Sequence, residues 1–149
     1  MTPLPLLQQR EIEAGVIAPL FRAFVAEVGE TRAREIVGGV IRELATQAGC
    51  AASANGNDLV HLKHTVEKWT EGGALELTVL RDDLEAFEFD VTRCRFAEMY
   101  ARLGLTELGG LLSCARDAAM IDGFNPDIAF SRTQTIMEGA THCDFRYRM

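Results

Sequence analysis

Three of the four cysteines lie in the C-terminal part of the chain, and two of them have an acidic residue close by in the sequence. Cys114 precedes Asp117 by three positions, Cys143 stands directly before Asp144, and Cys94 opens a short polar segment. A thiol beside a carboxylate can act as a nucleophile, bind a metal or pack as a small apolar side chain. The role of these thiols therefore decides which chemistry the protein can perform.

Cys114 and Asp117 have the most informative spacing. They fall on a predicted helix, where residues three positions apart share one face. A nearby carboxylate raises the pKa of a thiol, so the pair makes chemical sense if Asp117 is a base that takes the thiol proton or activates a water molecule. The alternative is structural: Cys114 packs as a buried apolar residue, while Asp117 caps a helix or pairs with an arginine.

The other two thiols are predicted to lie at the ends of strands. Cys143 shares its strand parity with Phe145 and Tyr147, so it faces the apolar side, either as a core residue or at the floor of a pocket. Cys94 falls where a strand ends and a helix begins, and a helix N-terminus lowers the pKa of a thiol. Cys94 is thus a second candidate nucleophile.

Arg132 is the unusual residue of its predicted strand, because it shares parity with the apolar residues Ile128, Phe130 and Ile136. An inward guanidinium must be paired or must line a wet pocket. In a pocket it could bind a carboxylate through two parallel hydrogen bonds. The alternative is a buried or cross-strand salt bridge to Glu98, Asp117 or Asp144.

The composition limits the partners of the protein. A net charge of −7 and the lack of a Lys/Arg run disfavour nucleic acid and anionic membrane surfaces. No apolar run approaches the length of a membrane span, and the N-terminus lacks the basic start of a secretory signal. We therefore expect a cytoplasmic protein with reduced cysteines. The absence of any Cys-x-x-Cys pair argues against a zinc ribbon or a thioredoxin-like centre.

The N-terminal half has the three- and four-residue apolar spacing of helices. The first helical stretch contains Pro19, which predicts a kink or a division into two shorter helices. A second helix is predicted from about Thr31 to Gly49, where the glycine would end it. A third helix would be capped by Asn57 or Asp58.

The apolar period then changes from helical to two, which is typical of half-buried strands. Four segments show this pattern and pair into two predicted hairpins: 75–80 with 86–92, and 127–137 with 142–148. Two helices, one near 96–103 and one across 108–119, are inserted between the hairpins. The sequence thus predicts a single α+β domain over residues 1–149, with a helical N-terminal half packed on an antiparallel sheet of about four strands.

Ordered motifs in the C-terminal half resemble those of the L-2-amino-thiazoline-4-carboxylic acid hydrolase family of small bacterial proteins. The resemblance spans residues 94–147 and is carried by Cys94 with Ala97-Glu98, Leu103-Gly104, Cys114-x-x-Asp117, Phe124-Asn125-Pro126, Arg132-Thr133, and Gly139 followed by Cys143-Asp144-Phe145-Arg146. The N-terminal helices match only in general character. Because Cys94, Cys114 and Cys143 each lie in a segment that carries the resemblance, we expect the three to approach one another in the fold, around a pocket or a metal.

The resemblance implies a hydrolase that opens a cyclic amidine, 2-aminothiazoline-4-carboxylate, in a bacterial route to L-cysteine. The candidate catalytic residues are Cys114, Asp117, Cys143 and Glu98. The candidate substrate-binding residues are Arg132, Asn125, Arg146 and Cys94. Asp117 or Glu98 would move protons, a cysteine would attack the amidine carbon or shape the pocket, and an arginine would hold the carboxylate.

The order of helices and hairpins is also similar to the four-vinyl-reductase type of ligand-binding domain, some of which bind zinc through cysteines near the sheet. The second hypothesis is therefore a non-catalytic module for a small ligand or for zinc. The hydrolase hypothesis needs no cofactor, whereas the zinc alternative would combine the three cysteines with Asp117 or His142. Both hypotheses expect a small-molecule partner, and both leave a homo-oligomer open.

Overall fold

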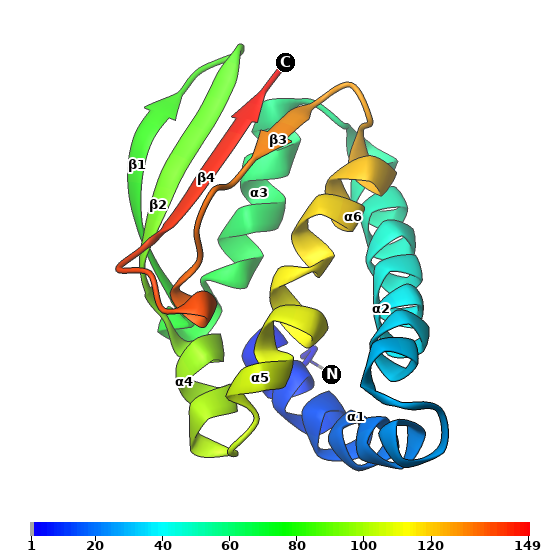
Figure 1. The fold of residues 1–149 in the computed structure, drawn as a ribbon. Helices are drawn as coiled ribbons and strands as arrows, with labels where there is room; N and C mark the ends of the chain where they lie inside the picture. Colours follow the sequence, from blue (N-terminus) through cyan, green and yellow to red (C-terminus); the bar gives the residue numbers. More distant parts are fainter. Residues whose placement is uncertain (1) are drawn as a thin grey trace.

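The computed structural model describes residues 2–149 and has the predicted α+β fold (Figure 1). The α-helices are α1 (Leu6–Val28), α2 (Glu30–Ala52), α3 (Leu59–Trp69), α4 (Arg95–Arg102), α5 (Thr106–Gly109) and α6 (Arg116–Phe124). The strands are β1 (Leu75–Asp82), β2 (Ala86–Cys94), β3 (Ala129–Ser131) and β4 (Cys143–Arg148). Short helical turns are η1 (Ser53–Asn55), η2 (Glu71–Gly73), η3 (Gly110–Cys114) and η4 (Ile136–Glu138). In Figure 1, α6 lies between the sheet and α2.

The strands form one antiparallel sheet in the order β1-β2-β4-β3. The predicted hairpins are confirmed, and the pairing of β2 with β4 joins them. Phe89 lies opposite Phe145, and Phe87 lies opposite Tyr147. Because side chains alternate along a strand, these aromatic residues share the inner face of the sheet with Phe130 and pack against α3 and α6.

The predicted strand 127–137 is too long, since β3 ends at Ser131. The chain leaves the sheet because the Asp144 carboxylate takes the place of a strand partner. It accepts hydrogen bonds from the backbone N–H groups of Thr133 (2.8 Å) and Gln134 (2.9 Å), and from the Thr133 hydroxyl. Arg132 stands at this departure from the sheet, and its side chain still crosses the inner face.

Pro19 does not divide the first helix, and α1 is continuous from Leu6 to Val28. A proline cannot donate to the carbonyl oxygen of the residue four positions earlier, which is Gly15. Both residues lie on the exposed face of α1, so water can bind that carbonyl. The helix ends before Gly29, whose φ of 83° is a left-handed value that glycine adopts without strain.

Gly49 does not end α2, because it is a contact residue between helices. A Cβ atom on Gly49 would lie 2.0 Å from the carbonyl oxygen of Met120, and one on Gly123 would lie 2.0 Å from the carbonyl oxygen of Thr46. The backbones of α2 and α6 therefore touch at two glycines. This contact fixes the position of α6, which carries Asp117.

A π-helical turn interrupts the helix predicted across 108–119. Within η3, the backbone N–H of Ala115 donates to the carbonyl oxygen of Gly110, five residues earlier, at 2.8 Å. The Arg116 guanidinium donates to the Leu112 carbonyl oxygen of the same turn (Nε to O, 2.7 Å). Turns of this kind often occur at functional sites.

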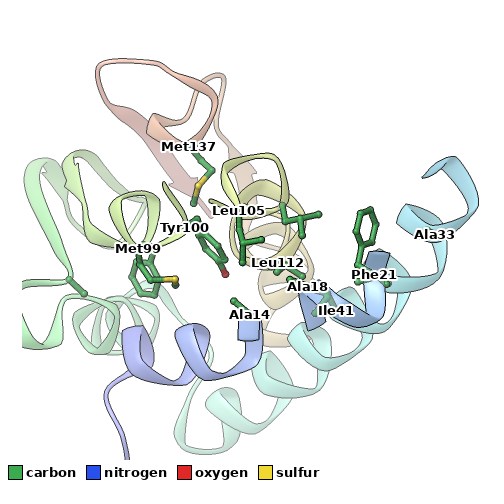
Figure 2. Packing of buried hydrophobic residues seen from close by; sticks show 14 residues of the cluster. Ala14, Ala18, Phe21, Ala33, Ile41, Met99, Tyr100, Leu105, Leu112 and Met137 are labelled. Carbon is green, nitrogen blue, oxygen red and sulfur yellow. The ribbon is translucent and has the colours of Figure 1, made fainter. Parts of the chain in front are cut away.

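The buried apolar residues form two clusters. The first lies among α1, α2, α4 and η3 and includes Ala14, Tyr100 and Leu112 (Figure 2). The second lies between the inner face of the sheet, α3 and α6. The partly buried Leu75 and Cys94 pack against both clusters and so mark the zone where the clusters meet.

Candidate functional site

A cavity of about 230 Å³ is lined by residues of both clusters. Cys94, Cys114 and Cys143 all line it, so the predicted approach of the three thiols is confirmed. Most of the wall is apolar. The apolar lining includes Leu6, Leu75, Val91, Met120, Met137 and Phe145.

Asp117 and Arg132 form an ion pair in this cavity. Their side chains are 20% and 16% exposed, and Nη1 of Arg132 lies 2.5 Å from Oδ2 of Asp117. Nη2 of Arg132 donates to the carbonyl oxygen of Cys114 in the π-helical turn at 3.2 Å. The guanidinium also lies over the rings of Phe130 and Phe145, 5.7 and 5.2 Å from their centroids. These contacts hold Arg132 in one orientation.

The carboxyl of Asp117 titrates close to neutral pH. Burial raises its pKa to about 6, although the charge of Arg132 pulls the pKa in the opposite direction. Burial disfavours the charged form of Arg132 as well, but the charge of Asp117 more than offsets this and raises the pKa of the guanidinium. Asp117 can therefore exchange a proton near neutrality, as a general acid or base must.

The three thiols are held in their protonated form. Burial, together with the charge of Asp117, raises the pKa of Cys114 to about 12. Burial also raises the pKa of Cys94 and of Cys143, although each sulfur accepts a backbone hydrogen bond, at 3.4 Å for Cys94 and 3.2 Å for Cys143. Cys94 caps α4 as expected, but burial outweighs the effect of the helix N-terminus. None of the three is an activated nucleophile in the free protein.

Sequence reasoning missed four polar residues of the cavity: Arg10, Thr65, Ser113 and Arg116. Arg10 belongs to α1, so only the packing of α1 against α2, α4 and the π-helical turn brings it to the site. Arg116 directly precedes Asp117 at the start of α6. This adjacency was the only feature of the sequence that could have pointed to Arg116. The Ser113 hydroxyl lies 2.7 Å from the hydroxyl of Tyr100.

Glu98 and Asn125 do not reach the cavity. Glu98 is exposed on α4, and it pairs with Arg93 (Oε1 to Nε, 3.0 Å). Asn125 is buried and ties two loops together. Its side chain donates to the carbonyl oxygen of Asn57 at 2.9 Å and accepts from the backbone N–H of Asp127 at 2.9 Å. Both hydrogen bonds of the Asn125 side chain thus join parts of the backbone to each other.

Arg146 is also absent from the cavity lining, because it lies on the outer face of the sheet. In β4 it alternates with Phe145 and Tyr147, which face inward. Its guanidinium donates to Asp90 (Nη2 to Oδ1, 2.9 Å) and to the carbonyl oxygen of Phe89 at 3.0 Å. These partners hold it on the side of the sheet away from the thiols.

The part of the chain that the structure describes forms no metal site. Among residues 2–149, no three His, Cys, Asp or Glu side chains come close enough together to hold a metal ion. The three thiols and Asp117 share a cavity without converging on one point, so the zinc site considered from the sequence does not fit. Over the same residues, no helix has the length and apolar character needed to cross a bilayer.

Comparison with known proteins adds two findings. The family model described as L-2-amino-thiazoline-4-carboxylic acid hydrolase matches residues 9–147. Among solved structures, the chain is similar to the phenol-responsive sensory domain of the transcription activator PoxR with phenol. That match has a TM-score of 0.51 and 14% identity, and it covers 99% of this chain and 76% of the other, so the likeness is one of fold. No curated protein matches the chain.

Proposed function

The chain belongs to the L-2-amino-thiazoline-4-carboxylic acid hydrolase family, and from this premise we propose that it hydrolyses a small cyclic amidine that bears a carboxylate. The observation that carries the proposal is Asp117, a carboxyl with a pKa of about 6 in a mainly apolar cavity. The size of the cavity supports a small substrate. A cavity of roughly 150 Å³ accepts benzene, so one of about 230 Å³ leaves room for a substituted five-membered ring.

The proposed reaction adds one water molecule to the ring. The water oxygen forms a bond to the amidine carbon, which lies between the ring sulfur and the ring nitrogen. The bond from this carbon to the sulfur then breaks, and the sulfur leaves as a thiol after it accepts a proton. The product is a carbamoyl-cysteine. The step is neither an oxidation nor a reduction, so it needs no further reactant.

Asp117 is the residue that moves the protons in this proposal. In its ionised form it accepts a proton from the attacking water, and it then returns the proton to the leaving sulfur. Arg132 binds Oδ2 of Asp117 and leaves Oδ1 available for the water. Because Arg132 is also bound to the Cys114 carbonyl and lies over two aromatic rings, we regard it as a positioning residue.

We assign the three cysteines to the wall of the pocket rather than to the attack. Their raised pKa values keep them protonated, and a thiol is a poor nucleophile compared with a thiolate. A small polarizable side chain still suits the surface that faces a ring sulfur.

A turnover assay tests this assignment. Purified protein is given L-2-amino-thiazoline-4-carboxylate, and the carbamoyl-cysteine formed is measured by chromatography. We expect Asp117→Asn to lower the rate by about a hundred- to ten-thousandfold, whereas Cys114→Ala keeps most of it. Asp122→Asn, an exposed position on the same helix, is the matched control. A loss in Cys114→Ala as large as that in Asp117→Asn would assign the attack to the thiol, and an inactive wild type would refute the hydrolase.

A second candidate function is a non-catalytic module that binds a small apolar ligand. Two observations favour it: the apolar wall of the cavity, and the likeness in fold to a sensory domain solved with phenol. Trp69 lines the cavity and is the only tryptophan of the chain, so its fluorescence reports occupancy. Tight binding of phenol without turnover of the amidine would favour this function.

We further propose that a second copy of the chain covers a row of exposed apolar residues on α1, called here the α1 row. Its members lie four residues apart and are 39–60% exposed: Ile12, Val16, Leu20, Phe24 and Val28. In an antiparallel pairing centred on Leu20, Ile12 meets Val28 and Val16 meets Phe24 of the second copy. A self-complementary row of this kind suits a two-fold dimer.

The reducing cytoplasm is the proposed location, in a bacterial route to L-cysteine. All four cysteines are free in the structure, and thiols stay free in a reducing compartment. A carbamoyl-cysteine would release L-cysteine after one further hydrolysis, of the carbamoyl group.

A further inference from the structure

Two buried arginines from distant parts of the chain line the cavity beside the ion pair of Asp117. Arg10 belongs to α1 and Arg116 to α6, and their side chains are only 15% and 13% exposed. A charged side chain is rarely buried to this degree without a charged partner. Arg10 and Arg116 therefore require a negatively charged partner.

Both arginines use one carboxylate, that of Glu13. Nη1 of Arg10 lies 3.1 Å from each oxygen of Glu13, and Nη2 of Arg116 lies 3.2 Å from Oε2. Arg132 already has its own partner in Asp117. The guanidinium groups at the cavity thus outnumber these two carboxylates by one. Burial, followed by the charge of Arg10, lowers the pKa of Arg116, which is the expected effect of two cations held close together.

Neutral hydrogen-bond donors stand beside the two arginines. Ser113 lines the cavity, and its hydroxyl bonds to that of Tyr100 at 2.7 Å. Tyr100 lies against α1, near Ala14 (Figure 2). Arg10, Glu13 and Arg116 all influence its pKa through their charges, which places the five polar groups in one region. This region offers two guanidinium forks and a hydroxyl, and its single carboxylate is already shared.

We propose that Arg10 and Arg116 form an anion subsite that receives the carboxylate of the ligand, with Ser113 as an additional donor. The inference rests on the proposed function and names the part of the site that selects for an acid. A planar guanidinium matches a carboxylate through two parallel hydrogen bonds. An incoming carboxylate supplies the missing negative charge, and Glu13, which is 38% exposed, can turn toward water as it enters.

The subsite restricts the class of substrate. Arg116 and Asp117 are adjacent residues, and the charges of both Arg10 and Arg116 act on the pKa of Asp117. The carboxylate that binds Arg116 and the atom that reacts beside Asp117 must therefore belong to one small molecule. This favours ring compounds in which the acid group is attached to the reacting ring itself, and it disfavours long or uncharged ligands.

Binding of simple probes tests the subsite without relying on turnover. Trp69 fluorescence is titrated with benzoate and with phenol, which share a ring and differ in the carboxylate. We expect Arg10→Gln and Arg116→Gln each to weaken benzoate binding by about ten- to a hundredfold and to leave phenol binding unchanged. Arg22→Gln, an exposed position on α1, is the control and should bind both probes as the wild type does.

If the arginine variants fold poorly, Glu13→Gln still tests the subsite, because its effect on benzoate binding is expected to be the opposite. Glu13→Gln removes the competing carboxylate, so it should tighten benzoate binding several-fold. The subsite is refuted if the wild type binds phenol as well as benzoate, or if Glu13→Gln weakens benzoate binding. Hydrolysis of the amidine with a KM that is unchanged in Arg10→Gln would refute the subsite alone. Selective benzoate binding without any hydrolysis would refute the hydrolase and keep the subsite.

Discussion

Asp117 owes its properties to two opposing effects on one side chain. Its burial beside apolar residues favours the neutral carboxyl, while Arg132 favours the carboxylate, and burial is the stronger effect. The result is a group that is ionised at neutral pH at a cost to the folded state. The same group would be ionised without that cost in the unfolded chain, where its pKa is near 3.8.

This difference predicts a specific dependence of stability on pH. Because the folded pKa lies above the unfolded value, the folded state binds more protons between the two values, and stability falls as the pH rises through this interval. Asp117 should make the free energy of unfolding about 1 kcal/mol lower at pH 7 than at pH 5. Urea unfolding at both pH values should show this decrease in the wild type and in Asp122→Asn but not in Asp117→Asn. Equal pH dependence in the wild type and Asp117→Asn would contradict it.

The thiols make a second prediction at the residue scale. A pKa of about 12 for Cys114, against an ordinary value of 9.0, reduces its thiolate fraction near neutral pH about a thousandfold. Iodoacetamide at pH 7.5 should therefore modify the exposed Cys50 first, and Cys94, Cys114 and Cys143 far more slowly. Peptide mass spectrometry over a time course measures the order. Early labelling of Cys114 would mean that the cavity activates its thiol.

The sequence predicted part of this site from side-chain type and position. The approach of Cys94, Cys114 and Cys143 could be expected only because each lies in a segment that carries the resemblance to the family. The ion pair of Arg132 was among the expected alternatives. Arg10 could not be predicted, because no local pattern shows which face of α1 packs against α4 and the π-helical turn.

At the scale of the elements, the contact between α2 and α6 positions the site. Gly49 and Gly123 let the two helix backbones touch, and the π-helical turn before α6 directs the carbonyl of Cys114 toward Arg132. The two-residue apolar period predicted the four strands and the two hairpins. It did not predict where β3 ends, because that end depends on hydrogen bonds of Asp144 with Thr133 and Gln134, which leave no mark in the apolar period.

The glycine contact predicts unequal effects of alanine within helices. Gly123→Ala would place a methyl group on the Thr46 carbonyl oxygen, so it should lower the free energy of unfolding by about 1–3 kcal/mol. Gly39→Ala has open space around the new methyl group and should raise it by about 0.5–1 kcal/mol. Thermal and urea unfolding of the two variants provide the comparison. Similar effects of both substitutions would show that the helices separate easily.

In the whole molecule, a sheet and a layer of helices enclose the cavity that holds Asp117, at the junction of the two apolar clusters. α1 takes part in this enclosure through Leu6 and Arg10, while its opposite face carries the exposed α1 row. The general α+β architecture was predictable from apolar periods. The cavity was not, since its walls come from elements that only the tertiary fold brings together.

The α1 row predicts self-association. Sedimentation velocity at increasing protein concentration should show a dimer, because pairing removes the row from water. Leu20→Glu places a charge at the centre of the pairing and should shift the equilibrium to monomer. Leu84→Glu, at an 80% exposed position in the turn between β1 and β2, should not. A wild type that stays monomeric at all concentrations would refute the dimer.

Because of the π-helical turn, the site depends on the exact number of residues in the segment Gly110–Cys114. Such a turn holds one more residue than the α-helical turn it replaces. An in-frame deletion of one codon within 110–114 would remove this extra residue and join α5 and α6 into one continuous α-helix, while the helices on either side keep nearly the same relative orientation. Ser113 and Cys114 belong to the widened turn, so the deletion would displace the segment that presents them to the cavity. Substitutions in this segment should thus be inherited far more readily than deletions.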